Sequence, residues 1–145
     1  MADVVDRTRS TSLEARLAFV VGRFNRRLLG ATGGLSHGLL SALSTVAKRG
    51  PIRMAELAVI ELVSAPSITR VVAELESRGL VERSDDPDDG RAFLIQVTPA
   101  GEDALVRARD ARAEVVSSML DGLDADQIAA IDSAIPALEA ALGDG

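Results

Sequence analysis

The 145-residue sequence contains no cysteine, which excludes disulfides, thiolate metal sites and cysteine-based redox sensing. Tyrosine and tryptophan are absent and only three phenylalanines occur, so the aromatic platforms on which single-stranded nucleic acids stack are not available. The single histidine, His37, cannot build a typical zinc site or serve a full catalytic set of nucleophile, base and orienting group. We therefore predict that the chain has no metal, no cofactor and no enzymatic activity.

Long hydrophobic runs are also missing. No stretch approaches the roughly 18 consecutive apolar residues of a membrane span. The first residues include Asp3 and Asp6 and lack the apolar segment of a signal peptide. We expect a cytoplasmic protein without membrane association, and the length favours one domain over residues 1–145.

The formal net charge of -6 argues against nucleic acid as a partner, but the charges are unevenly distributed. Residues 1–72 contain ten Lys or Arg and five Asp or Glu, whereas residues 73–145 contain six and seventeen. This asymmetry fits a basic face on an acidic body, and a solvated helical surface would give the same counts. Both interpretations stay open at this point.

The first half of the chain contains two predicted helices. Thr11 and Glu14 have the spacing of a capping box and open a helix that Gly30 ends. A second helix follows a glycine-containing loop, and the basic and helix-ending residues 48–51 close it. Its apolar residues are expected to point inward: Leu39, Leu40, Leu43 and Val46.

A helix-turn-helix is predicted in the middle of the chain. Residues 54–62 form a short helix, and Ser64 caps the next one, which Gly79 ends. Its apolar residues recur at i, i+3, i+4 and i+7, so one side packs in the core and the other stays free. The core side comprises Ile68, Val71, Val72 and Leu75, and the free side comprises Ser67, Thr69, Arg70 and Ala73.

A hairpin is predicted directly after these helices. Residues 81–83 form one strand, and the alternation over residues 93–97 forms the other. The acidic stretch 84–90 is then the hairpin loop. The fold class is therefore mainly α with a small β-hairpin: a winged helix-turn-helix over residues 35–98.

Two further helices are predicted after the hairpin. The Thr98–Pro99 pair opens a long helix to about Leu120. Asp124 and Gln127 form a capping box for the last helix, which Pro136 should bend or break.

The terminal helices, over residues 11–30 and 99–143, have apolar faces that one compact core cannot easily cover. Burial against a second copy in a twofold dimer is the favoured interpretation, and packing back on the same domain is the alternative. The residues expected at the dimer interface are Leu13, Leu17, Val20, Val116, Met119, Ile128, Ile131, Ile135 and Leu138.

These patterns resemble the MarR family, the multiple antibiotic resistance regulators, over nearly the whole chain. The wing motif of that family, Asp-x-Arg followed by an aliphatic residue and Thr, is matched by Asp89, Arg91 and Val97–Thr98. The helix motif is matched by SAPSITRVVAELESRGLVER over residues 64–83. Two departures stand out. Glu61–Leu62 replaces the usual Leu-Gly in the turn, and Gly90 replaces a residue that is often basic.

The resemblance implies a homodimeric transcription regulator, usually a repressor, that binds double-stranded DNA. Its recognition helix would enter the major groove, where Ser and Thr hydroxyls and an Arg can contact base edges. Arg91 would enter the minor groove, oriented by Asp89. The charge count, and not the resemblance, adds Arg53, one of the nearest basic residues in sequence, as a source of phosphate affinity. The predicted DNA-binding residues are Ser64, Ala65, Pro66, Ser67, Thr69, Arg70, Asp89, Arg91 and Arg53.

The charge of residues 65–98 argues against strong DNA binding. Between residues 65 and 98 there are four Arg and seven acidic residues, so binding should be weak, with a shallow salt dependence, unless basic residues of the first two helices contribute. The competing hypothesis is a winged-helix protein-interaction module that no longer binds DNA.

The resemblance also implies a small aromatic or anionic effector that releases a pseudo-palindromic operator with half-sites about 10 bp apart. Candidate lining residues for an effector pocket are Phe19, Phe24, His37 and Leu40.

Overall fold

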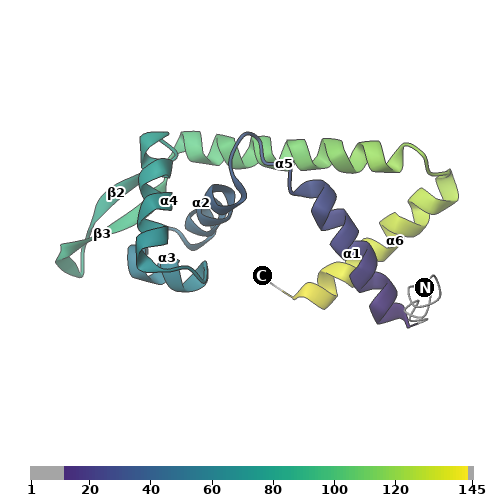
Figure 1. The fold of residues 1–145 in the computed structure, drawn as a ribbon, viewed down its shortest axis with the longest axis horizontal. Helices are drawn as coiled ribbons and strands as arrows, with labels where there is room; N and C mark the ends of the chain where they lie inside the picture. The colour runs from purple at the N-terminus through teal and green to yellow at the C-terminus, as the bar shows by residue number, and fades with distance from the viewer. Residues whose placement is uncertain (1–11, 144–145) are drawn as a thin grey trace, which may run out of the picture. The chain divides into compact units, whose positions relative to one another are not determined.

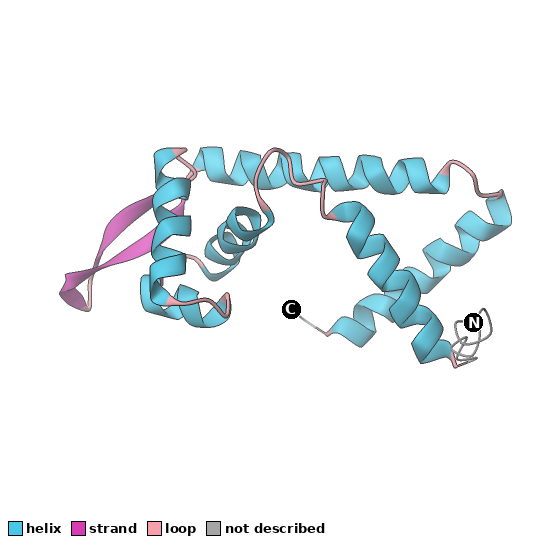
Figure 2. Cartoon of the chain, viewed as in Figure 1, coloured by secondary structure: helices cyan, strands magenta, loops and turns pink. Residues whose placement is uncertain are grey.

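The computed structural model describes residues 12–143, which form six helices and one small sheet (Figures 1 and 2). The elements in chain order are α1 (Leu13–Leu28), α2 (His37–Arg49), β1 (Ile52–Arg53), α3 (Met54–Ile60), α4 (Ala65–Ser77), β2 (Val81–Asp86), β3 (Asp89–Val97), α5 (Pro99–Leu120) and α6 (Ala125–Leu142). The predicted fold class, mainly α with a small hairpin, is confirmed.

The sheet is antiparallel with strand order β1-β3-β2. Strand β1 was not predicted, because two residues are too short to display an alternating pattern. The predicted hairpin loop over residues 84–90 is wrong, since β2 extends to Asp86 and β3 begins at Asp89. The loop is shorter than predicted because Asp86 is buried and hydrogen-bonded within the sheet. A count of acidic residues does not reveal this.

The hydrophobic core lies among α2, α3, α4, the sheet and the first half of α5. The helix-turn-helix places Ile68, Val72 and Leu75 inside, as predicted, with Val71 half-buried beside them. The largest fully buried side chains are Leu43, Leu57, Ile68, Leu75, Ile95, Val46 and Val72.

Several helix ends follow the capping signals in the sequence. Ser64 Oγ accepts a hydrogen bond from the Ser67 amide and caps α4 as predicted. The N-cap of α1 is Ser12, whose Oγ accepts from the Ala15 amide at 3.2 Å, and not the predicted Thr11, which lies outside the described residues. Helix α3 stops at Ile60, two residues earlier than predicted.

The turn between α3 and α4 forms even though glycine is missing from it. Leu62 adopts φ 55, the left-handed conformation that a glycine would take without strain. Its neighbour Glu61 accepts a hydrogen bond from Thr45 Oγ1 on α2 at 2.5 Å. The departure from Leu-Gly therefore leaves the turn in place, with Leu62 in a disfavoured conformation.

The last two helices begin as predicted. Thr98 Oγ1 accepts from the Gly101 amide at the start of α5, and Asp124 and Gln127 form the complete capping box of α6. Pro136 does not break α6, which continues to Leu142.

Contacts divide the described residues into two compact units, one that ends at Arg112 and one that begins at Ala113. Helices α1 and α6 contain no buried residue. Over the described range 12–143, no helix combines the length and the apolar character needed to cross a membrane.

Candidate nucleic-acid interface

The N-cap and the first two turns of α4 present a polar surface. Ser64, Ala65, Pro66, Thr69 and Arg70 are exposed, and Ser67 is half-buried. The Ser64 hydroxyl donates to Ser67 Oγ at 2.9 Å, and Thr69 Oγ1 donates to the Ala65 carbonyl oxygen at 2.8 Å. Because these protons are used within the helix, the hydroxyl oxygens remain as hydrogen-bond acceptors, while Arg70 is a donor. This end of α4 thus offers both kinds of group to an approaching base edge.

Two of the four arginines between residues 65 and 98 are neutralised by glutamates. Arg78 pairs with Glu74 at 2.8 Å, one helical turn away. Arg83 makes two hydrogen bonds to Glu76, at 2.7 and 2.8 Å. Arg70 and Arg91 have no ion pair with any of the described residues. The unpaired arginines are therefore the two that sequence reasoning assigned to DNA.

Arg83 also connects α4 to the hairpin. Its guanidinium carbon lies 4.2 Å from the centroid of the Phe93 ring on β3 while its nitrogens bind Glu76 on α4. The hydrogen bond from Arg83 to Glu76 raises the pKa of Arg83. The sequence did not predict this link. Glu76 and Arg83 are seven residues apart with the helix-ending Gly79 between them, so no helical periodicity indicates that they are in contact.

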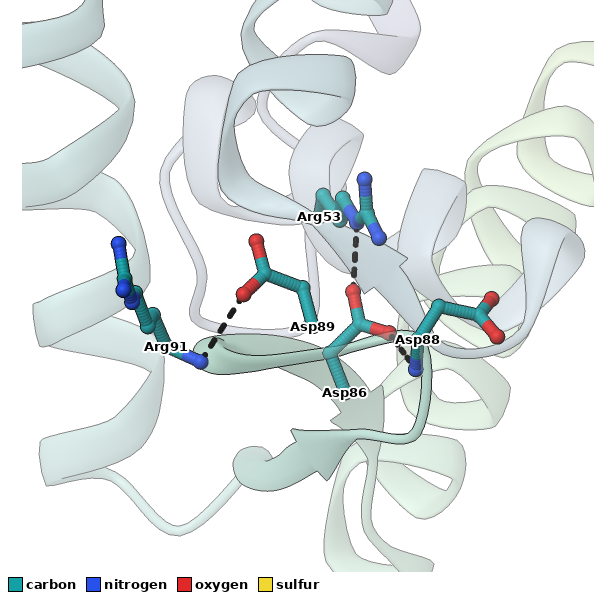
Figure 3. Close-up of polar contacts among 5 residues, drawn as sticks. All are labelled: Arg53, Asp86, Asp88, Asp89 and Arg91. Atoms are coloured by element: carbon teal, nitrogen blue, oxygen red, sulfur yellow. Dashed lines mark hydrogen bonds and ion pairs between the residues drawn. The ribbon is translucent and has the colours of Figure 1, made fainter.

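The wing tip differs from the prediction in one contact. Asp89 Oδ1 accepts from the backbone amide of Arg91 at 3.0 Å, and within the described residues it forms no ion pair with the Arg91 guanidinium (Figure 3). Asp89 therefore contacts Arg91 through its backbone and not through its guanidinium, because a separation of two residues favours a hydrogen bond to the backbone. Arg91 itself is exposed.

Arg53 lies at the edge of the sheet and contacts the wing. Its Nε donates to Asp86 Oδ2 at 2.6 Å, and the Asp88 amide donates to the other oxygen at 2.9 Å (Figure 3). The side chain of Asp86 is 3% exposed and that of Arg53 is 51% exposed. The hydrogen bond from Arg53 lowers the pKa of Asp86 and raises that of Arg53.

The seven acidic residues of this region are accordingly not seven free charges. Three of them pair with arginines, as described above, and Glu82 accepts a hydrogen bond from Gln96 at 2.7 Å. The remaining three, Asp85, Asp88 and Asp89, are exposed and lie at the wing tip. The repulsion that the sequence predicts is thus confined largely to the tip.

Comparison with known proteins decides the family. Residues 35–93 match the MarR family. The chain is 37% identical over 114 residues to an HTH-type transcriptional regulator of Mycobacterium bovis, covering 77% of this chain and 80% of that protein. The chain belongs to the MarR family. Proteins of this family are DNA-binding transcriptional regulators and not enzymes, in agreement with the prediction.

Solved structures share the MarR fold. A transcriptional regulator from Thermotoga maritima superimposes with a TM-score of 0.76 at 22% identity, over 89% of this chain and 92% of that one. A mutant MarR from E. coli complexed with operator DNA gives a TM-score of 0.59 at 21% identity, over 87% of this chain and 92% of that one.

A pocket of about 600 Å³ lies between α2 and the first part of α5 of this MarR family chain. Two of the four predicted effector residues, His37 and Leu40, line it. Phe19 and Phe24 on α1 do not, and Phe19 is 64% exposed. The pocket also contains basic residues that sequence reasoning did not assign to it: Lys48, Arg109 and Arg112. The sequence does contain a signal for them: Leu105, Arg109 and Arg112 have the i, i+4, i+7 spacing that places residues on one face of a helix.

The predicted dimerisation residues lie on exposed or half-buried surface. Leu13 is 74% exposed on α1, and Ile128, Ile131, Ile135 and Leu138 are 37–43% exposed on α6. Val116 and Met119 on α5 are half-buried.

Proposed function

We propose that this MarR family protein is a transcriptional repressor that binds a pseudo-palindromic operator as a homodimer. The observation that carries the proposal is that Arg70 on α4 and Arg91 on the wing have no ion pair among the described residues. The other arginines of this region are neutralised by glutamates. An Arg at the start of a recognition helix can bind guanine through two hydrogen bonds, and an Arg on a wing is attracted to narrow A·T-rich minor grooves. The operator complex of the related E. coli MarR supports DNA as the partner.

The apolar surface of the terminal helices supports the proposed homodimer. Large apolar side chains are exposed on α1 and, separately, on α6, and exposed apolar surface of this kind marks an interaction site. A second copy would cover them and set two α4 helices against half-sites about 10 bp apart. Occupying such an operator would block transcription sterically. A regulator that acts on DNA has to be in the same compartment as the DNA, so we also propose a cytoplasmic location.

The pocket between α2 and α5 supports the effector. His37, Lys48, Arg109 and Arg112 supply positive or hydrogen-bonding groups, and Leu40 and Leu105 supply apolar surface. We propose that a small anionic molecule with an apolar body binds there. It would release DNA by binding more tightly to a dimer geometry that does not match the half-site spacing.

Titration of the full-length protein with DNA from upstream of its own gene, at several salt concentrations, tests the DNA-binding proposal. Arg70→Ala and Arg91→Ala should each weaken binding about tenfold. Arg107→Ala on α5 removes the same charge from an exposed position elsewhere and serves as the control, with little change expected. If binding shows no sequence preference and Arg91→Ala leaves it unchanged, the protein is better described as an interaction module.

The effector proposal is tested by thermal unfolding with benzoate as an aromatic anion. Benzoate should raise the midpoint for the wild type, because a ligand that binds only the folded state stabilises it. The shift should disappear when Arg109 and Arg112 are both replaced by Gln. An equal shift in that double variant would place benzoate outside this pocket.

A further inference from the structure

The tip of the wing receives little support from the rest of the sheet. Strand β1 pairs only with Leu94 and Ile95 of β3, through Arg53 and Ile52 respectively. Closer to the tip, β3 pairs with β2 alone. A two-stranded hairpin is at best marginally stable by itself. The backbone that carries Arg91 therefore needs another contact if it is to hold a fixed position.

The side chain of Arg53 supplies that contact by crossing the sheet. Its backbone is fixed by pairing with Leu94, and its Nε reaches Asp86 at the end of β2, on the far side of β3 (Figure 3). Asp86 lies where the β2–β3 register shifts, between Asp85 and Asp86, and it also accepts the Asp88 amide. The buried carboxylate thus joins the outer strand to the turn of the wing.

The charges around Arg53 argue against direct contact with DNA phosphates. The carboxylates of Asp86, Asp89 and Asp88 all raise the pKa of Arg53, so three negative groups act on this one guanidinium. A cation that is compensated in this way contributes little to phosphate attraction, because affinity of that kind comes from net positive charge. Arg91 has no such ion pair within the described part of the chain.

We infer that Arg53 is a positioning residue: it fixes the wing turn through Asp86 and promotes operator binding through the placement of Arg91, without touching DNA itself. The inference rests on the proposed function and assigns different roles within that site: Arg91 contacts DNA, and Arg53 positions Arg91. It replaces the role of phosphate contact that the sequence suggested for Arg53.

Replacement of Asp86 by Asn separates the two roles of Arg53. Direct phosphate contact predicts tighter operator binding by Asp86→Asn, because a negative charge is removed and Arg53 is released. Positioning predicts weaker binding by about tenfold, similar to Arg91→Ala. The control is Asp85→Asn, which removes the same charge at the exposed neighbouring residue and should bind as well as the wild type or better. Unchanged or tighter binding by Asp86→Asn would overturn the inference.

A double-mutant cycle on the full-length protein provides the second measurement, and it also covers the case in which Asp86→Asn does not fold. Arg53→Gln should weaken operator binding about tenfold alone, yet add little when Arg91→Ala is already present, since both changes remove one contact. Arg53→Lys should restore part of the loss. Independent, multiplicative losses would show that Arg53 acts separately from Arg91 and overturn the inference. Failure of Arg91→Ala to weaken binding would instead contradict the proposed function.

Discussion

The winged lobe, residues 31–108, and the helices α1 and α6 differ in where their apolar residues lie. All of the buried apolar side chains described in this chain lie between Ala31 and Ala108. In contrast, α6 has Ala, Ile or Leu at twelve of its 18 positions and none of its residues is buried. Helix α1 likewise has no buried residue, although it contains Leu13, Leu17 and Phe19.

Apolar residues in the helices of this chain therefore have two different roles. In α4 they form the face that packs in the lobe's own core. In α1 and α6 the apolar residues lie on surface that one chain leaves exposed, which supports the proposed dimer interface. The lobe should therefore depend on contacts within one chain, and the terminal helices on a second copy.

The largest expected effect is the loss of the lobe in Gly101→Ala. A Cβ at this position would overlap the Leu80 carbonyl oxygen and lie 2.8 Å from Val97 Cγ2, so α5 could no longer approach the base of the wing. We expect a loss of about 3 kcal/mol in the free energy of unfolding, or failure to fold. Denaturant unfolding measures it. Gly38→Ala is the matched control, since beyond its chain neighbours and its own helix backbone no atom lies within 4 Å of its Cβ position, and it should be neutral or stabilising.

The second prediction concerns assembly. Replacing Ile131 and Ile135 by Ser should raise the dimer dissociation constant by at least tenfold, because both side chains would leave an apolar interface. The lobe should retain its fold. Sedimentation at a series of concentrations measures the first effect, and circular dichroism measures the second. Asp132→Ser on the same helix is the control. A variant that stays fully dimeric would show that this face of α6 is not the interface.

The helix-turn-helix and its caps were predictable because their signals are local. Ser64 and Asp124 cap the helices that they were expected to cap, since a capping hydrogen bond spans only three residues. The long-range features were not predictable. Strand β1 has two residues, and the Arg53–Asp86 bond spans 33 positions, so neither produces a pattern within one stretch of sequence.

The candidate site shows the same limit. The sequence assigned Arg70 and Arg91 to DNA by their position in a motif, and the structure adds that neither has an ion pair among the described residues. The sequence could not show that glutamates neutralise Arg78 and Arg83, because side-chain pairing depends on geometry across elements. Counting charges consequently overstated the free negative charge of the wing.

A smaller effect is expected at the turn of the helix-turn-helix. Leu62 is 91% exposed and adopts φ 55, a conformation that costs roughly 1–2 kcal/mol for a residue with a Cβ. Leu62→Gly should raise the free energy of unfolding of the lobe by about 0.5–1 kcal/mol, after the greater flexibility of glycine in the unfolded chain is subtracted. Dimer dissociation should not change. Leu29→Gly, at an exposed residue with negative φ, should destabilise instead.

The smallest expected effect is a change in acid sensitivity that belongs to the lobe alone. Asp86 has a pKa below its ordinary value, chiefly because Arg53 donates a hydrogen bond to it, with the Asp88 amide as the second cause. An Asp in an unfolded chain titrates near pH 3.9, so this stabilisation is complete above about pH 4 and is lost as the pH falls toward the lower pKa of the folded state. In Asp86→Asn, unfolding free energy should therefore fall less steeply below pH 4 than in the wild type. Urea unfolding at several pH values, with both proteins carrying the two α6 serines, measures the lobe without interference from dimer dissociation. Asp85→Asn, at the exposed neighbour, is the control and should keep the wild-type slope of unfolding free energy against pH. If the curves for Asp86→Asn and the wild type are parallel, the Arg53–Asp86 contact contributes nothing to the acid stability of the lobe.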